Sequence, residues 1–200
     1  MTLAFEKFML EYGMTGAEKA DGYSPSAFLE LDEREKKIVF SLLVKELPWS
    51  AEWLFPLDPD AALIIAKEKE KELRGNGYAH VYKLQQFIVK YSGDLVYQAH
   101  MIEDYPNYDE DLKPRVVDAI HCTPKNSATA EFFKRVILTE VTTDAVARAS
   151  RHFLDDLSFP NATGEEKNIY RRLMNELRSD GLKDKLGAIR YVEKWRAGNN

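Results

Sequence analysis

The sequence predicts an all-α protein, and two observations support this prediction. Apolar residues recur at spacings of three and four along most of the chain. Residues that cap helices precede these runs, and glycine or proline often follows them. One segment, 115–123, is rich enough in β-branched residues to leave a strand as an alternative. Its short length and Pro114 favour a helix there as well.

Short linkers join the helices that this spacing predicts. The helices span residues 32–47, 58–75, 77–94, 94–105, 112–124, 127–139, 142–157, 164–179 and 182–196. A short helical turn with Trp49 and Trp53 lies between the first two, and we expect these indoles to fill the hydrophobic core. No Gly/Ser-rich or Pro-rich linker divides the chain, so we expect residues 1–200 to form a single helical domain.

Helix starts are marked by side chains that can accept hydrogen bonds from free backbone N–H groups. Asp32 and Glu35 have the spacing of a capping box, and Pro48 ends that helix. Pro59 is predicted to lie in the first turn of the next helix and Gly75 to end it. The remaining predicted caps are Asp58, Asp94, Ser127, Thr163 and Asp144.

Neighbouring helices pair at a period of roughly 34–47 residues, which is typical of helical solenoids. The expected pairs are 32–47 with 58–73, 78–91 with 94–105, 127–139 with 142–157, and 164–179 with 182–196. Two second helices share a pattern: DLVYQA from Asp94 and DAVARA from Asp144 each have Val two residues and Ala five residues later. KPRVVDA, at 113–119, is a looser relative.

These segments resemble the second helices of HEAT/armadillo-like repeats, which often read D-x-x-V-R-x-x-A, over residues 78–157. The resemblance implies helical hairpins stacked as a short α-solenoid, in which Val points inward and Ala lets the paired helix approach. An irregular helical bundle without a true repeat stays the alternative.

Composition limits the function classes. The net charge is −5, which opposes general nucleic-acid binding and suits a basic protein partner. The single cysteine, Cys122, excludes an intrachain disulfide and suits a reducing cytoplasm. Charges at Glu6, Lys7 and Glu11 interrupt the first apolar run, so we expect no secretory signal. We also expect no membrane span.

The most acidic segment is IEDYPNYDED, from Ile102 to Asp111. It does not fit a calcium loop, because Leu112 stands where a loop started at Asn107 needs glycine. A solvated linker and a protein-contact surface remain as interpretations. In the second interpretation the two tyrosines are anchors among the acids, since tyrosine is favoured at interface hot spots.

Other candidate chemistry is sparse. His100 has Glu103 and Asp104 three and four residues on, and His152 has Asp155 and Asp156 at the same spacing. Each trio could offer two metal ligands, but the sequence fixes no third and fourth ligand. Histidine–carboxylate pairs on the protein surface are therefore the preferred interpretation. Cys122 is expected to be buried and structural. We therefore predict no catalytic residues, no metal, no cofactor and no enzyme activity.

The function that follows is protein binding. The chain resembles the helical-repeat immunity proteins of bacterial toxin systems, which implies a cytoplasmic inhibitor that neutralises a basic, nuclease-like toxin. The residues predicted to bind this partner are Glu103, Asp104, Tyr105, Tyr108, Asp109, Glu110, Asp111, Asp155 and Asp156. The alternative is a HEAT-like nucleic-acid binder, similar to DNA glycosylases, supported by the basic stretch 164–197 and its Trp195.

Overall fold

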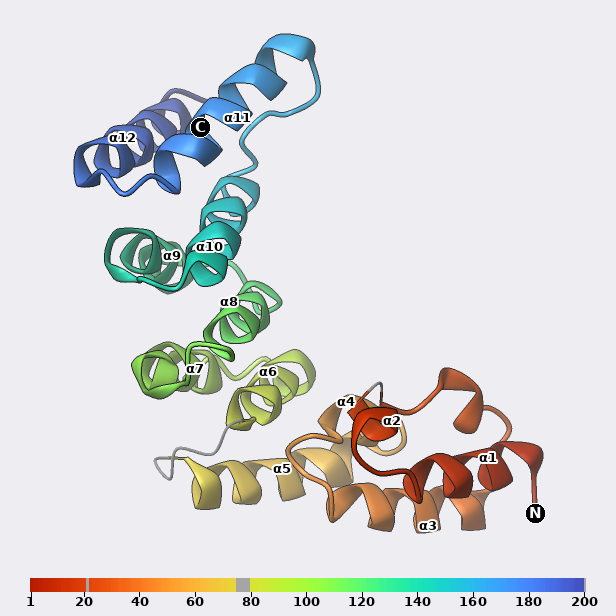
Figure 1. The fold of residues 1–200 in the computed structure, drawn as a ribbon. Helices are drawn as coiled ribbons and strands as arrows, with labels where there is room; N and C mark the ends of the chain where they lie inside the picture. Colours follow the sequence, from red (N-terminus) through yellow and green to blue (C-terminus); the bar gives the residue numbers. More distant parts are fainter. Residues whose placement is uncertain (21, 75–79, 200) are drawn as a thin grey trace. The chain divides into compact units, whose positions relative to one another are not determined.

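The computed structural model of the chain describes residues 1–20, 22–74 and 80–199, with the side chains of residues 20 and 199 left aside. All regular secondary structure in these ranges is helical, which confirms the predicted all-α class (Figure 1). The segment in which a strand was the alternative forms a helix, Lys113–His121. The predicted helix end at Gly75 lies outside the described residues; the helix itself ends at Leu73.

Contacts along the chain divide it into two compact units, Met1–Gly93 and Asp94–Asn200. Each unit buries its own set of apolar side chains, including Phe8, Leu43 and Leu54 in the first unit and Phe133 and Leu154 in the second. Our sequence prediction treated residues 1–200 as a single domain, whereas the contacts group the chain into two parts. The two units are therefore described separately.

The described residues of the first unit, 1–20, 22–74 and 80–93, form seven helical elements. They are α1 (Leu3–Tyr12), α2 (Ala17–Ala20), the 3₁₀ turn η1 (Pro25–Ala27), α3 (Glu33–Val44), α4 (Ala51–Leu54), α5 (Pro59–Leu73) and α6 (Val81–Ser92). Helix α5 packs along α6, and α4 contacts both. The face of α6 that the spacing predicts, Val81, Leu84 and Ile88, is buried.

Aromatic side chains of the first unit pack around Tyr23. Its ring centroid lies 5.0 Å from that of Phe8, 5.6 Å from that of Trp49 and 5.3 Å from that of Trp53. Gly22 has φ +81°, and a Cβ there would come within 2.3 Å of the Trp53 ring, so the close approach requires glycine. Both tryptophans thus pack inside this unit, as the sequence predicts.

The second unit is an array of helices in two layers. Its elements are α7 (Val96–Asp104), the 3₁₀ turn η2 (Tyr105–Asn107), α8 (Lys113–His121), α9 (Ser127–Thr139), α10 (Thr143–Asp156), α11 (Gly164–Leu177) and α12 (Leu182–Asn199). Helix α9 contacts α7 and α12, and α10 contacts α8 and α11 (Figure 1). The layers are therefore α7–α9–α12 and α8–α10–α11, an arrangement that stacked helical hairpins produce.

The helices that share the Asp-Val-Ala pattern do not bury the same positions. In α10, Val146 and Ala149 are buried, as predicted. In α7, Val96 is 55% exposed and Ala99 is exposed as well, so the prediction for this helix is wrong. Helix α7 instead buries Gln98 and Met101. It packs in the layer with α9, whereas KPRVVDA of α8 shares the layer of α10.

The predicted helix starts are partly confirmed. Asp32 forms the predicted capping box with Glu35, and Asp58 caps α5 with Pro59 in its first turn. Thr163 caps α11. Two starts are shifted in the structure: Asn126 rather than Ser127 caps α9, and Asp144 lies in the first turn of α10 after Thr142. The Asp94 carboxylate accepts a hydrogen bond from the backbone N–H of Val96, where α7 begins, as predicted.

Candidate partner-binding surface

The predicted acidic segment joins α7 to α8 in the second unit. Helix α7 ends at Asp104, η2 follows, and α8 starts at Lys113. Between them Asp109, Glu110 and Asp111 are exposed. Backbone N–H groups of Leu112 and Lys113 donate to the Asp109 carbonyl, which forms the turn that leads into α8. The three carboxylates therefore lie just before a helix N-terminus, where the helix dipole favours negative charge.

One carboxylate holds both ends of this segment. Glu140, at the end of α9, accepts a hydrogen bond from the Tyr105 hydroxyl at 3.1 Å and pairs with the Lys113 ammonium at 2.9 Å through the same oxygen, Oε2. Its Oε1 accepts from the backbone N–H groups of Val141 at 2.8 Å and Thr142 at 3.1 Å. Tyr105 starts η2 and Lys113 starts α8, so Glu140 fixes the two points between which the acidic residues lie.

The ionised form of Glu140 is strongly favoured. Burial by itself raises the pKa of this carboxyl, but the hydrogen bonds from Lys113, from the Thr142 and Val141 backbone and from Tyr105 outweigh it. The balance lowers the pKa of Glu140 to about 2. The anchor of the segment therefore stays charged throughout the neutral and mildly acidic range.

The two predicted tyrosine anchors have different environments. Tyr105 is only 4% exposed, and its ring meets that of Phe132 edge-on at 5.0 Å. It is part of the core and leaves no surface with which to anchor a partner, so we remove it from the candidate surface. Tyr108 is half-buried and follows η2 directly. Glu103 is exposed and Asp104 half-exposed at the end of α7.

The remaining predicted acids, Asp155 and Asp156, lie elsewhere in the unit. Asp156 is at the C-terminal end of α10, where its carboxylate lies 3.0 Å from His121 Nδ1 and 3.2 Å from the Lys125 ammonium. His121 ends α8, so the length of that helix, about 13 Å, separates this pair from the segment before its N-terminus. Asp155 accepts from the Tyr170 hydroxyl at 3.2 Å. These two acids do not join the surface around Asp109.

A pair of stacked histidines connects α8 to α10. The rings of His121 and His152 lie 3.8 Å apart with an angle of 11° between their planes. His152 donates from Nε2 to Asp118 at 2.8 Å. Burial and the neighbouring His121 lower the pKa of His152 more than Asp118 raises it. His152 therefore pairs across to α8, rather than with Asp155 and Asp156 on its own helix.

Cys122 is exposed, so the expectation of a buried cysteine is wrong. It follows the last residue of α8 as its C-cap, outside the packed face of the helix. Over the ranges that the structure describes, no group of three or more His, Cys, Asp or Glu side chains could hold a metal ion.

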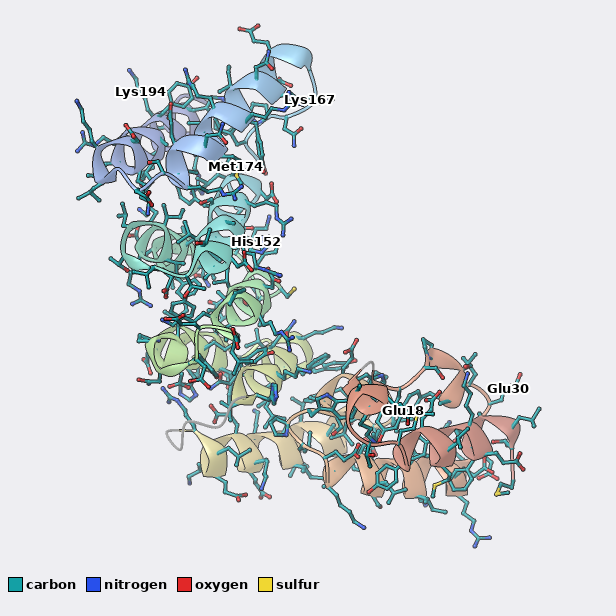
Figure 2. All side chains as sticks on the ribbon, in the orientation of Figure 1. Glu18, Glu30, His152, Lys167, Met174 and Lys194 are labelled. Carbon is teal, nitrogen blue, oxygen red and sulfur yellow. The ribbon has the colours of Figure 1, made fainter. Side chains whose placement is uncertain are left out.

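The aromatic residues of the basic C-terminal stretch are engaged in packing. The Trp195 ring lies 4.8 Å from that of Phe159, and the Arg172 guanidinium lies 5.3 Å from the Tyr191 ring centroid. Most of the cations there are exposed, among them Lys167 on α11 and Lys194 on α12 (Figure 2). The arrangement fits helix exteriors whose aromatic residues face neighbouring elements.

No protein family matches the chain, and no significant match was found among curated proteins or solved structures. Among the helices that the structure describes, none combines the length and apolar character needed to cross a membrane. The candidate surface therefore rests on its own geometry. We name it the acidic loop and define it as Glu103, Asp104, Tyr108, Asp109, Glu110 and Asp111.

Proposed function

We propose that this protein is a protein-interaction module whose acidic loop binds a basic partner, and that the partner is the toxin of a bacterial toxin–immunity pair. The observation that carries the proposal is the acidic loop itself. Asp109, Glu110 and Asp111 are exposed, and none forms an ion pair with another residue that the structure describes. Their charge is therefore available to attract cations on a partner, which speeds association and favours the correct partner.

Two further observations support this assignment. The part of the acidic loop from Tyr108 to Asp111 lies between two buried or half-buried residues, Tyr105 and Lys113, which both contact Glu140, so the backbone that carries its carboxylates is held in place. The net charge of −5 gives the whole chain the same sign as the loop. Inhibition would then follow from covering the active region of a basic nuclease-like domain. A cytoplasmic location would fit this role.

The test uses the full chain and the basic toxin domain that an affinity pull-down with this chain recovers from the native host. We expect the triple variant Asp109→Lys, Glu110→Lys, Asp111→Lys to bind this domain at least about tenfold more weakly, because three favourable charges become repulsive. The salt dependence of the affinity should also decrease. Calorimetry at about 50 mM and about 200 mM salt measures both quantities.

A matched control reverses three exposed acids of the first unit, Glu52→Lys, Asp60→Lys and Glu68→Lys. It changes the net charge by the same amount but leaves the acidic loop intact, so most of the affinity should remain. Equal losses in both variants would reduce the effect to net charge. Unchanged affinity and salt dependence in the acidic-loop variant would show that the partner binds elsewhere.

A further inference from the structure

A groove lined by three arginines, in contrast to the acidic loop, lies between α10 and α11 and has a volume of about 360 Å³. Its walls are formed by Asp144, Ala147, Arg148, Arg151, Met174 and Arg178. Figure 2 shows Met174 where α11 approaches α10. Arg148 and Arg151 are three residues apart on α10, and Arg178, which follows the last residue of α11 as its C-cap, is four residues after Met174. Both helices therefore turn one face towards the groove.

The first arginine of the groove is held in place. Arg148 forms an ion pair with Asp118 of α8. Asp118 also accepts from His152, so it is fixed from two sides. The Arg148 side chain is 41% exposed and that of Asp118 is 35% exposed. Arg148 thus keeps a defined orientation at the wall while part of its guanidinium still faces solvent.

The other two arginines are not neutralised. Arg151 and Arg178 are exposed and form no ion pair with any residue that the structure describes. They approach the groove from different helices, so their guanidinium groups can converge on one ligand. The planar guanidinium fork matches the two oxygens of a carboxylate or phosphate, and such bidentate pairs are among the strongest hydrogen-bonded contacts in proteins.

The rest of the lining indicates which anion fits. Asp144 would repel a phosphate backbone that ran along the groove, and the net charge of −5 opposes nucleic acid at long range. A peptide can satisfy both signs, because its acidic side chains face the arginines while a backbone N–H or a basic side chain faces Asp144. Met174 and Ala147 offer apolar contact to the methylene groups of such side chains.

We propose that the α10–α11 groove is a docking site for an acidic peptide segment of a protein partner, with Arg151 and Arg178 binding its carboxylates and Arg148 completing the wall. The site uses neither the residues nor the sign of charge of the acidic loop, so it stands independently of the function proposed above. A partner that carries both a basic patch and an acidic segment could occupy both surfaces of the second unit.

The test titrates the ¹⁵N-labelled full chain with a capped peptide of three consecutive glutamates, its all-glutamine counterpart and single-stranded oligothymidylate. We expect the glutamate peptide to shift the arginine side-chain signals of the groove and the glutamine peptide to leave them unchanged. In the double variant Arg151→Ala, Arg178→Ala the dissociation constant should rise about tenfold or more. The variant Arg151→Lys, Arg178→Lys keeps the positive charge but removes the planar guanidinium groups. Its dissociation constant for the glutamate peptide should lie between those of the unmodified chain and the double alanine variant.

The matched control is Arg190→Ala with Lys194→Ala, two exposed cations of α12 that do not line the groove. It removes the same charge and should bind the glutamate peptide like the unmodified chain. Backbone amide spectra check that every variant remains folded. Tighter arginine-dependent binding of oligothymidylate would overturn the peptide assignment in favour of nucleic acid. No binding of the glutamate peptide, or equal loss in the control, would overturn the site itself.

Discussion

His152 shows how one side chain couples two helices of the second unit. Its ring stacks on His121 of α8 and donates to Asp118 of the same helix. From α9, Phe133 covers it at 5.8 Å between ring centroids. The titratable and charged groups that act on it are Asp118 and His121 on α8 and Arg151 on α10 itself. A proton on His152 would place a positive charge in a desolvated site beside the Arg151 guanidinium.

This arrangement predicts a loss of stability at mildly acidic pH. The native pKa of His152 is lowered, so between the native pKa and about 6.5 the unfolded state binds a proton that the native state does not. The free energy of unfolding therefore falls as pH drops below about 6.5. Urea unfolding at a series of pH values, followed by amide signals of α8 and α10, measures this.

The variant His152→Gln should reduce this pH dependence, because the titrating group is gone. His100→Gln, at a half-buried histidine of α7 outside the stack, is the control and should retain it. If the unmodified chain and His152→Gln lost stability in parallel between pH 7 and 5.5, other groups would be responsible.

At the scale of elements, α10 is the helix on which the second unit depends. It packs against α9, α8 and α11, and its Ala145 and Ala149 are fully buried. Small residues at these positions let neighbouring helices approach, as the HEAT-like pattern implies. Because protein interiors are close-packed, there is no room for three further carbon atoms at position 149.

We expect Ala149→Leu to lower the free energy of unfolding of the second unit by about 1–3 kcal/mol through overpacking. Alanine and leucine have similar helix propensities, so the loss reports packing rather than helix formation. Ala128→Leu, on the exposed side of α9, should change it by less than about 0.5 kcal/mol. Thermal and urea unfolding of both variants compare the two positions, and equal effects would contradict tight packing at Ala149.

The elements also show what sequence reasoning could reach. The capping box of Asp32 with Glu35 and the buried face of α6 were predictable, because both depend on residues within a turn or two of one another. The start of α9 was missed by one residue, since Asn126 and Ser127 are both good caps and only the turn after Pro124 selects the first. The exposed Val96 was not predictable, because it depends on which face of α7 meets α8 and α9.

The candidate site was only half predictable for the same reason. The charge of Asp109, Glu110 and Asp111 is visible in the sequence, and so is their place before a helix. The hydrogen bond of the Tyr105 hydroxyl joins it to Glu140, 35 residues away. Asp118 and His152 are 34 residues apart. No local pattern relates such partners, so the acidic loop could be found from the sequence while its anchor and the histidine pair could not.

At the scale of the whole molecule, the contacts divide the chain into two compact units. The boundary falls at Gly93, which has φ +71° and caps α6. The hydrogen bonds of Glu140, Asp118 and Gln98 all lie within residues 94–200. A fragment of these residues therefore contains every contact described for the acidic loop and the α10–α11 groove.

We expect residues 94–200, produced alone, to fold into a helical unit. Far-UV circular dichroism should show a helical spectrum and a cooperative thermal transition. Amide signals of α8, α9 and α10 should superpose on those of the full chain. A fragment without cooperative unfolding would show that residues 1–93 are needed to stabilise the second unit.

The carboxylate of Glu140 has a consequence for the thermodynamics of association. Ordering a mobile segment on binding costs conformational entropy, about 1–2 kcal/mol for each residue whose backbone is fixed. Here the chain reversal from Tyr105 to Lys113 is already closed in the free protein by one charged group and its four hydrogen-bonded or ionic partners. Preorganisation of this kind transfers the entropic cost of ordering the backbone from binding to folding, so a partner meets a segment whose backbone is already in place.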